Sequence, residues 1–129
     1  MSNNMIKAML AFVPLAMAHH NEIVRKVTPE SIYAADASPT YKLLMDVNDT
    51  VKIKMCLPPS ALGNWHAQKP VGAADYYNLT EHHSCDLELC HYEWTIDAIE
   101  TTYDLRADID TCLIFSAPNG DELEMRLNI

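Results

Sequence analysis

The fold class of this chain is decided by one stretch, Cys90-His-Tyr-Glu-Trp-Thr-Ile-Asp-Ala98. Residues of a β-strand point alternately to the two faces of a sheet, so a strand with one apolar face shows a period of two. Here the apolar and polar sets alternate without a break: Cys90, Tyr92, Trp94, Ile96 and Ala98 against His91, Glu93, Thr95 and Asp97. The stretch therefore predicts a half-buried antiparallel strand.

The same alternation occurs in the segments 51–57, 109–116 and 123–129, which predict three more strands. Between the last two, Pro118-Asn119-Gly120-Asp121 predicts a tight hairpin of type I′, because Asn-Gly accepts positive φ angles. Alternation also assigns one face of each strand to the interior. The residues that we expect in the core are Val51, Ile53, Met55, Tyr92, Trp94, Ile96, Leu123, Met125 and Leu127.

Shorter strands are expected at 23–27, 41–47 and 73–79, and the segment 41–47 is expected to form a hairpin with 51–57. The segment 29–37 is ambiguous between a helical turn and irregular structure. Many short strands and few helices predict an all-β fold, a small antiparallel β-sandwich or β-barrel stabilised by disulfides.

The N-terminus has the three parts of a secretory signal peptide in order. Lys7 supplies a positive charge, residues 8–18 are uncharged and mostly apolar, and Ala16-Met17-Ala18 is a small-residue cleavage site. The apolar run is too short to span a membrane. We expect a signal peptide at 1–18, a single mature domain at 19–129, secretion from the cell, and no membrane insertion.

The mature chain contains four cysteines, an even number that is typical of small secreted domains. Three connectivities are open. We favour a short bridge between Cys85 and Cys90, and a long bridge between Cys56 and Cys112 that joins distant strands. Two Asn-x-Thr sequons, at Asn48 and Asn78, are candidate glycosylation sites.

The charge of the chain is acidic, with a formal net charge of −9 and a pI near 4.9. Nucleic acids and anionic membranes bind clustered Lys and Arg, so neither is an expected partner. The region with the most glycine and proline, 58–76, is the expected binding loop. Trp65, with His66 beside it, is the candidate contact residue; the alternative is that Trp65 folds back onto the core.

Histidines suggest a metal site in two ways. Cleavage after Ala18 would leave His19 at the N-terminus, where its amine and imidazole are able to chelate copper together with a second histidine. His82 and His83 are the other metal candidates. The Cys/His spacing between residues 81 and 91 matches no established zinc module. Copper is therefore an alternative only, and we expect no cofactor.

The chain shows no nucleophile elbow, no phosphate-binding loop and no His-Glu-x-x-His motif. A ribonuclease-like pair of His and Glu could be assembled, but no spacing selects one. A small secreted hydrolase therefore remains an alternative. We expect a protein without catalytic activity.

The pattern Cys85-x4-Cys90-x-Tyr92-x-Trp94-x-Ile96, behind a signal peptide, resembles that of small secreted fungal proteins. These include effector-like proteins and the β-barrel Alternaria major-allergen type. The resemblance implies an all-β, non-enzymatic protein that acts on a host or a neighbouring organism. We therefore expect a binding protein, a monomer or weak homodimer, whose partner is a protein or glycan outside the cell.

Overall fold

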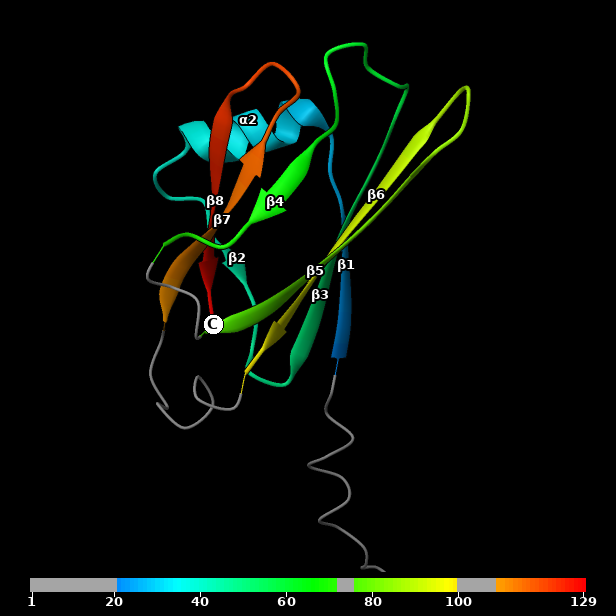
Figure 1. Ribbon diagram of the computed structural model, residues 1–129. Coiled ribbons are helices and arrows are strands. Elements are labelled where there is room, and N and C mark those ends of the chain that lie inside the picture. The colour runs from blue at the N-terminus through cyan, green and yellow to red at the C-terminus, as the bar shows by residue number, and fades with distance from the viewer. Residues whose placement is uncertain (1–20, 72–75, 100–108) are drawn as a thin grey trace, which may run out of the picture.

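The computed structural model describes residues 21–71, 76–99 and 109–129. In these ranges the chain forms eight strands and one helix, arranged as two facing sheets (Figure 1). The first sheet has the order β1-β3-β6-β5, formed by Asn21–Lys26, Asp49–Leu57, Cys90–Ala98 and Tyr77–Cys85. The second has the order β2-β8-β7-β4, formed by Leu43–Leu44, Glu122–Asn128, Asp110–Ser116 and His66–Gln68. The all-β prediction is confirmed.

The strand pairing is mixed rather than antiparallel throughout. β1 pairs with β3 in parallel, and β2 pairs with β8 in parallel, while the remaining neighbours are antiparallel. β1 and β2, the strands that pair in parallel with β3 and β8, each lie at the edge of a sheet. The hairpin predicted between 41–47 and 51–57 is wrong, because β3 already has β1 and β6 on its two sides. β2 instead joins the other sheet, where it buries Leu43.

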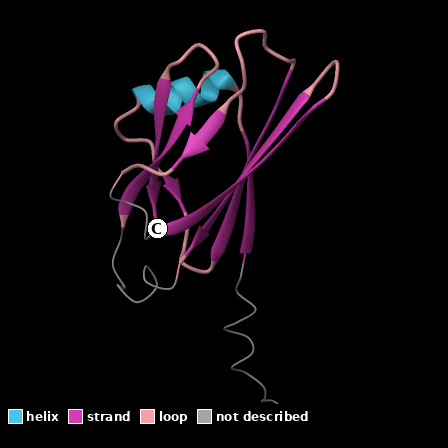
Figure 2. Ribbon diagram, viewed as in Figure 1, coloured by secondary structure: helices cyan, strands magenta, loops and turns pink. Residues whose placement is uncertain are grey.

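The helix α2, Pro29–Ala37, settles the segment that the sequence left ambiguous. Thr28 caps it by accepting a 3.2 Å hydrogen bond from the Ser31 amide, and Ser31 Oγ accepts one of 2.9 Å from the Thr28 amide. Pro29 occupies the first turn, where its missing N–H costs nothing. The helix lies against the second sheet (Figure 2). It packs on β8, and its Ile32 is fully buried.

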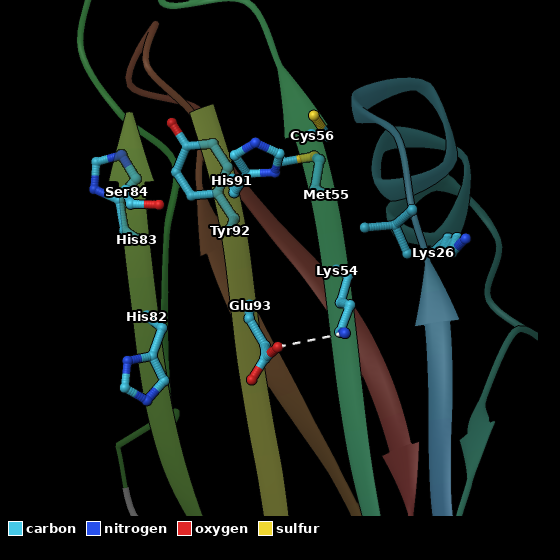
Figure 3. A pocket seen from close by; sticks show the side chains of 11 residues that line it. Lys26, Lys54, Met55, Cys56, His82, His83, Ser84, His91, Tyr92 and Glu93 are labelled. Carbon is cyan, nitrogen blue, oxygen red and sulfur yellow. Dashed lines mark ion pairs between the residues drawn. The ribbon is translucent and has the colours of Figure 1, made fainter. Parts of the chain in front are cut away.

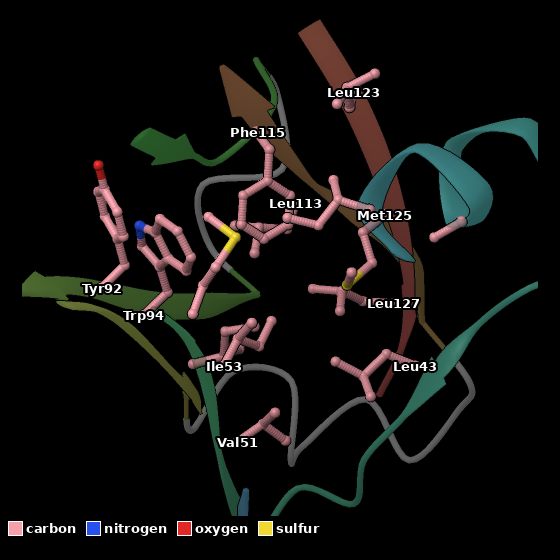
Figure 4. Packing of buried hydrophobic residues seen from close by; sticks show 14 of the residues in the cluster. Leu43, Val51, Ile53, Tyr92, Trp94, Leu113, Phe115, Leu123, Met125 and Leu127 are labelled. Carbon is pink, nitrogen blue, oxygen red and sulfur yellow. The ribbon is translucent and has the colours of Figure 1, made fainter. Parts of the chain in front are cut away.

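The core lies between the two sheets, and every residue predicted to face inward from β3, β6 and β8 is buried there (Figure 4). A line of aromatic rings crosses it. Tyr92 stacks on Trp94 at 5.5 Å, and Trp94 meets Phe115 of β7 edge-on at 5.0 Å. Such pairs add to the stability that burial alone provides. The aromatic residues of β6 therefore join the first sheet to the second.

One of the two predicted disulfides is present. Cys85 and Cys90 are bonded across the β5–β6 hairpin, where they face each other in register. Cys56 and Cys112 are both free, which corrects the predicted long bridge. Cys56 lies on the outer face of β3 and Cys112 on β7 of the other sheet, at a position that alternates with the buried Leu113. The core separates the two thiols.

The β7–β8 hairpin forms at the predicted place but with a different turn. The Gly120 amide donates to the Ala117 carbonyl at 2.9 Å, so Pro118 and Asn119 are the central residues. Proline fixes φ near −65°, which a type I′ turn does not accept at its first central position. Gly120, with φ of +95°, follows the turn and takes the left-handed conformation itself.

The predicted signal peptide and His19 lie outside the described residues. The strand expected at 73–79 begins in an undescribed segment, and β5 extends it from Tyr77 through Cys85. Within the described ranges, no helix has the length and apolarity needed to cross a bilayer.

Candidate functional site

Three connections gather at one end of the sandwich, and we call this surface the loop end: residues 58–65, 86–89 and 117–121. The pairing register of the flanking strands places these three connections at the same end. Leu57 and Cys85, the last residues of β3 and β5, both pair with Cys90. Ser116, the last residue of β7, pairs with His66 at the start of β4. Figure 1 shows the three connections side by side, above the ends of both sheets.

The tips of the loop end carry exposed apolar side chains. Leu62 in the first connection is 73% exposed, Leu87 in the hairpin 86–89 is 98% exposed, and Leu89 is also exposed. A partner that covers a leucine exposed on a short, closed turn removes apolar surface from water, and this stabilises the complex. Sequence patterning missed these residues, because a single leucine in a turn has no period.

Tyr92 anchors the first connection to the core. Its phenol oxygen accepts a hydrogen bond from the Trp65 amide and donates one to Asn64 Oδ1, each at 3.4 Å. The Trp65 side chain is only 5% exposed, so the structure selects the alternative in which it folds back onto the core. Trp65 therefore supports the loop that presents Leu62, and is not itself an exposed contact.

Tyr33 of the helix connects two of the three loops. Its phenol donates a 2.7 Å hydrogen bond to Asp121 Oδ2 and accepts one of 3.4 Å from Asn119 Nδ2. Its ring meets the Trp65 ring edge-on at 6.4 Å. The hydrogen bond to Asp121 raises the pKa of Tyr33, so the phenol stays protonated and donates.

The hairpin 86–89 is closed by several independent bonds. Asp86 Oδ1 accepts hydrogen bonds of 2.8 Å from the amides of Glu88 and Leu89, and these hold the pKa of Asp86 below its usual range. The Asp86 amide donates to the Leu89 carbonyl at 2.9 Å. The Cys85–Cys90 disulfide closes the base of the hairpin, so Leu87 is presented on a rigid turn.

His66, the second predicted binding residue, lies at the seam between the sheets. Its Nδ1 is 2.8 Å from Glu81 Oε2, and the Ala67 amide donates to Glu81 Oε1 at 3.2 Å. Burial alone would raise the pKa of Glu81, but the hydrogen bonds with His66 and the Ala67 amide, together with the nearby Trp94 and the charge of His66, lower that pKa. The contacts join β5 of the first sheet to β4 of the second.

Of the three candidate metal histidines, His82 and His83 lie among the described residues, and they do not share a site. His82 pairs with Glu93 on the outer face of the first sheet, while His83 pairs with Tyr92 and stacks on its ring at 4.6 Å. Neighbouring residues of a strand face opposite ways, so one ion does not reach both imidazoles. The sequon residues Asn48 and Asn78 are both exposed.

The outer face of the first sheet contains an open groove of about 730 Å³ (Figure 3). Lys54 and Glu93 pair across it at 3.6 Å. The free Cys56 lies opposite His91 in register. Lysines, histidines and a carboxylate are mixed there, and no ligand chemistry is singled out.

Comparison with known proteins relates the chain to a solved structure. No family model matches the sequence, and no curated protein matches it. The fold is similar to the crystal structure of the cysteine protease inhibitor EhICP2 from Entamoeba histolytica, with a TM-score of 0.52 and 15% identity. The match covers 85% of this chain and 94% of the other. The likeness is one of fold, and the resemblance to small secreted fungal proteins stays a prediction.

Proposed function

We propose that this protein binds and inhibits a cysteine protease, with the loop end as its contact surface. The observation that carries the proposal is a fold shared with a cysteine protease inhibitor over nearly the full length of both chains. The loop end supplies a surface of the right kind, and the exposed leucines at its tips are its principal contacts. Binding is then the whole activity, and the protein needs no catalytic residues of its own.

Burial of the leucines supports this assignment energetically. Covering one fully exposed leucine side chain contributes about 1.5–3 kcal/mol. Leu62 and Leu87 stand on separate connections, so a partner that covers both gains from each. Protease–inhibitor interfaces typically bury about 1,600 Å² in total, which requires more than one loop.

Rigidity also favours inhibition over loose association. Ordering a flexible loop on binding costs free energy, and a loop already fixed avoids that cost. The hairpin 86–89 is closed by the disulfide and by Asp86, and the connection 58–65 is fixed by Tyr92. Tyr33 fixes the turn 117–121. All three connections are therefore held before a partner arrives.

Charge at the loop end specifies the partner further. The three connections contain Asp86, Glu88 and Asp121 and no lysine or arginine. Complementary charge speeds association and favours a partner with a basic rim around its cleft. We expect association with the protease to slow as salt is added.

The test is an inhibition assay with papain and a panel of other cysteine proteases, using a fluorogenic peptide and trypsin as a serine-protease control. We expect inhibition of at least one cysteine protease and none of trypsin. Leu87→Asp should raise the inhibition constant about 10- to 100-fold, from the loss of one buried leucine.

Leu44→Asp is the matched control. Leu44 is also exposed, at 63%, but it pairs with Asn128 at the opposite end of the second sheet. It should leave inhibition unchanged. If the two substitutions raised the inhibition constant equally, the loop end would not be the contact surface. If no cysteine protease of the panel were inhibited, the proposed function would be wrong.

We further propose that the protein is secreted and acts outside the cell. The supporting observations are the predicted signal peptide and the exposure of both sequon asparagines, Asn48 and Asn78. Expression in a eukaryotic secretory host, followed by intact-mass analysis of the medium, tests this. We expect a chain that begins at His19 and carries glycans; a product that begins at Met1 would contradict the proposal.

A further inference from the structure

We propose that His83, Cys85 and Cys90 form a binding site for a soft metal ion such as Zn²⁺ when the Cys85–Cys90 disulfide is reduced. The candidate ligand atoms, one imidazole nitrogen and two Sγ atoms, all lie within 4.8 Å of one another. His83 Nε2 is 3.1 Å from Cys85 Sγ. Among the described residues this is the one group of three His, Cys, Asp or Glu side chains whose candidate ligand atoms all lie so close together.

The β5–β6 ladder explains why the three side chains meet. Cys85 faces Cys90 in register, so their side chains lie on the same face of the sheet. His83 precedes Cys85 by two residues and therefore points to that face as well. Because the three ligands stand on two hydrogen-bonded strands, their backbone positions are set before any ion binds.

Ligand chemistry selects the ion. Thiolates and imidazole are the ligands that Zn²⁺ prefers, at about 2.3 Å for sulfur and about 2.0–2.1 Å for nitrogen. Tetrahedral geometry at those lengths puts the ligand atoms about 3.5–3.8 Å from each other. The observed spacing is close enough for side-chain rotation to reach that geometry. Two cysteines and one histidine leave a fourth position open to water or to a partner's ligand.

The surroundings of His83 favour a fixed ring. The His83 and Tyr92 rings lie nearly parallel, with an interplanar angle of 7°, and Figure 3 shows them side by side on neighbouring strands. Tyr92 is itself stacked on Trp94 in the core. Stacking on an anchored ring restrains the plane of the His83 imidazole before an ion binds.

Access is compatible with an exchangeable ion. Cys90 is buried, at 1% exposure, while His83 and Cys85 are exposed. The ion would therefore sit at the surface with one ligand reaching inward, and its open position would face solvent at the base of the hairpin 86–89.

The disulfide and the metal site exclude each other, since oxidised sulfurs carry no thiolate. A dithiol reductant supplies two electrons and two protons, breaks the S–S bond and becomes a disulfide itself, leaving two thiols on Cys85 and Cys90. Metal binding then releases both thiol protons and forms two metal–sulfur bonds. The base of the hairpin would be closed by a covalent bond under oxidising conditions and by the ion under reducing ones.

The test is a Co²⁺ titration of the full chain under anaerobic conditions, after reduction with a phosphine and removal of the reductant. We expect one ion per chain, visible ligand-field bands of a tetrahedral site and thiolate charge-transfer absorption in the near ultraviolet. Zn²⁺ should displace the Co²⁺. The oxidised protein should show none of these bands.

Paired variants identify the ligands. His83→Gln should weaken Co²⁺ binding at least about tenfold, whereas His82→Gln, one residue away on the other face, should leave it unchanged. Cys56→Ser combined with Cys112→Ser removes both free thiols and should also leave it unchanged. Unaltered binding in His83→Gln, or loss of the charge-transfer band in the Cys56/Cys112 double variant, would overturn the proposed site. Neither result bears on protease inhibition by the oxidised form.

Discussion

The phenol of Tyr33 donates a 2.7 Å hydrogen bond to Asp121, a residue 88 positions further along the chain. This bond fastens the helix to the turn 117–121, and the edge-on contact of Tyr33 with Trp65 fastens it to the connection 58–65. The helix is therefore more than a cover for β8. It determines the relative position of two of the three connections at the loop end.

Tyr33→Phe should loosen the turn 117–121 without unfolding the protein. The variant keeps the ring that touches Trp65 and loses only the hydroxyl that binds Asp121. Hydrogen exchange measured by mass spectrometry should show faster exchange in 117–121. Exchange in the hairpin 86–89 should be unchanged, because the Tyr33 phenol makes its hydrogen bonds with Asn119 and Asp121. Equal acceleration in both segments would mean that Tyr33 acts on the whole fold.

Trp94→Ala should cost about 3–5 kcal/mol, because Trp94 is fully buried between Tyr92 and Phe115. Trp65→Ala should also destabilise the fold, by about 3 kcal/mol, since its side chain is almost fully buried at the edge of the core. Urea melts of the two variants measure both losses. A loss below about 1 kcal/mol for Trp65 would restore it as an exposed contact residue.

Glu81→Gln should lower stability at neutral pH by less than about 1 kcal/mol, because solvent screens the contact with His66. The pKa of Glu81 is lower in the folded chain than in the unfolded one, where it is about 4.3. The stabilisation that ionised Glu81 provides is therefore fully present above about pH 4.3. It is lost as the pH falls through the lower pKa of Glu81 in the folded chain.

Urea melts of wild type and Glu81→Gln between pH 7 and pH 3 check this. The two curves should converge at the acidic end. Glu88→Gln is the control, since Glu88 is exposed in the hairpin and its side chain has no ion pair among those described. If the difference in free energy of unfolding between wild type and Glu81→Gln widened on acidification, the lowered pKa of folded Glu81 would be contradicted.

The two free cysteines should react with iodoacetamide at different rates in the native protein. Cys56 is exposed, whereas Cys112 is half-buried. Burial, followed by the nearby charge of Glu124, raises the pKa of the Cys112 thiol to about 11, so little of it is the reactive thiolate at neutral pH. Peptide mapping over time should find Cys56 labelled first. In protein that is unfolded without reduction, two cysteines should be labelled. All four should be labelled only after the Cys85–Cys90 disulfide is also reduced.

Cys85→Ser combined with Cys90→Ser should cost about 2 kcal/mol in the oxidised protein, the chain-entropy value for so short a loop. Cys56→Ser combined with Cys112→Ser is the matched double variant and should cost less than about 1 kcal/mol, because no bond is lost. Thermal melts compare the two. A larger loss for the second variant would indicate a bond between Cys56 and Cys112.

Alternation of residue type by itself determined the all-β class, the position of four long strands and the inward face of each. That information is local, because neighbouring residues of a strand must face opposite ways. The bonded pair Cys85–Cys90 was equally local, since five residues of separation span one hairpin. A tight turn at Pro118-Asn119-Gly120 was predicted for the same reason, although its type was not.

Which strands pair, and therefore which connections meet at the loop end, depends on contacts between distant parts of the chain. β2 joins β8 rather than its sequence neighbour β3, and this choice depends on which sheet edge is free. Cys56 and Cys112 stay apart because each lies on the outer face of its own sheet, with the core between them. Trp65 is buried because Tyr33 and Tyr92, distant in sequence, meet it. Leu62 and Leu87 lie at the same end of the sandwich because strand register brings their connections there, and no local pattern records register between distant strands.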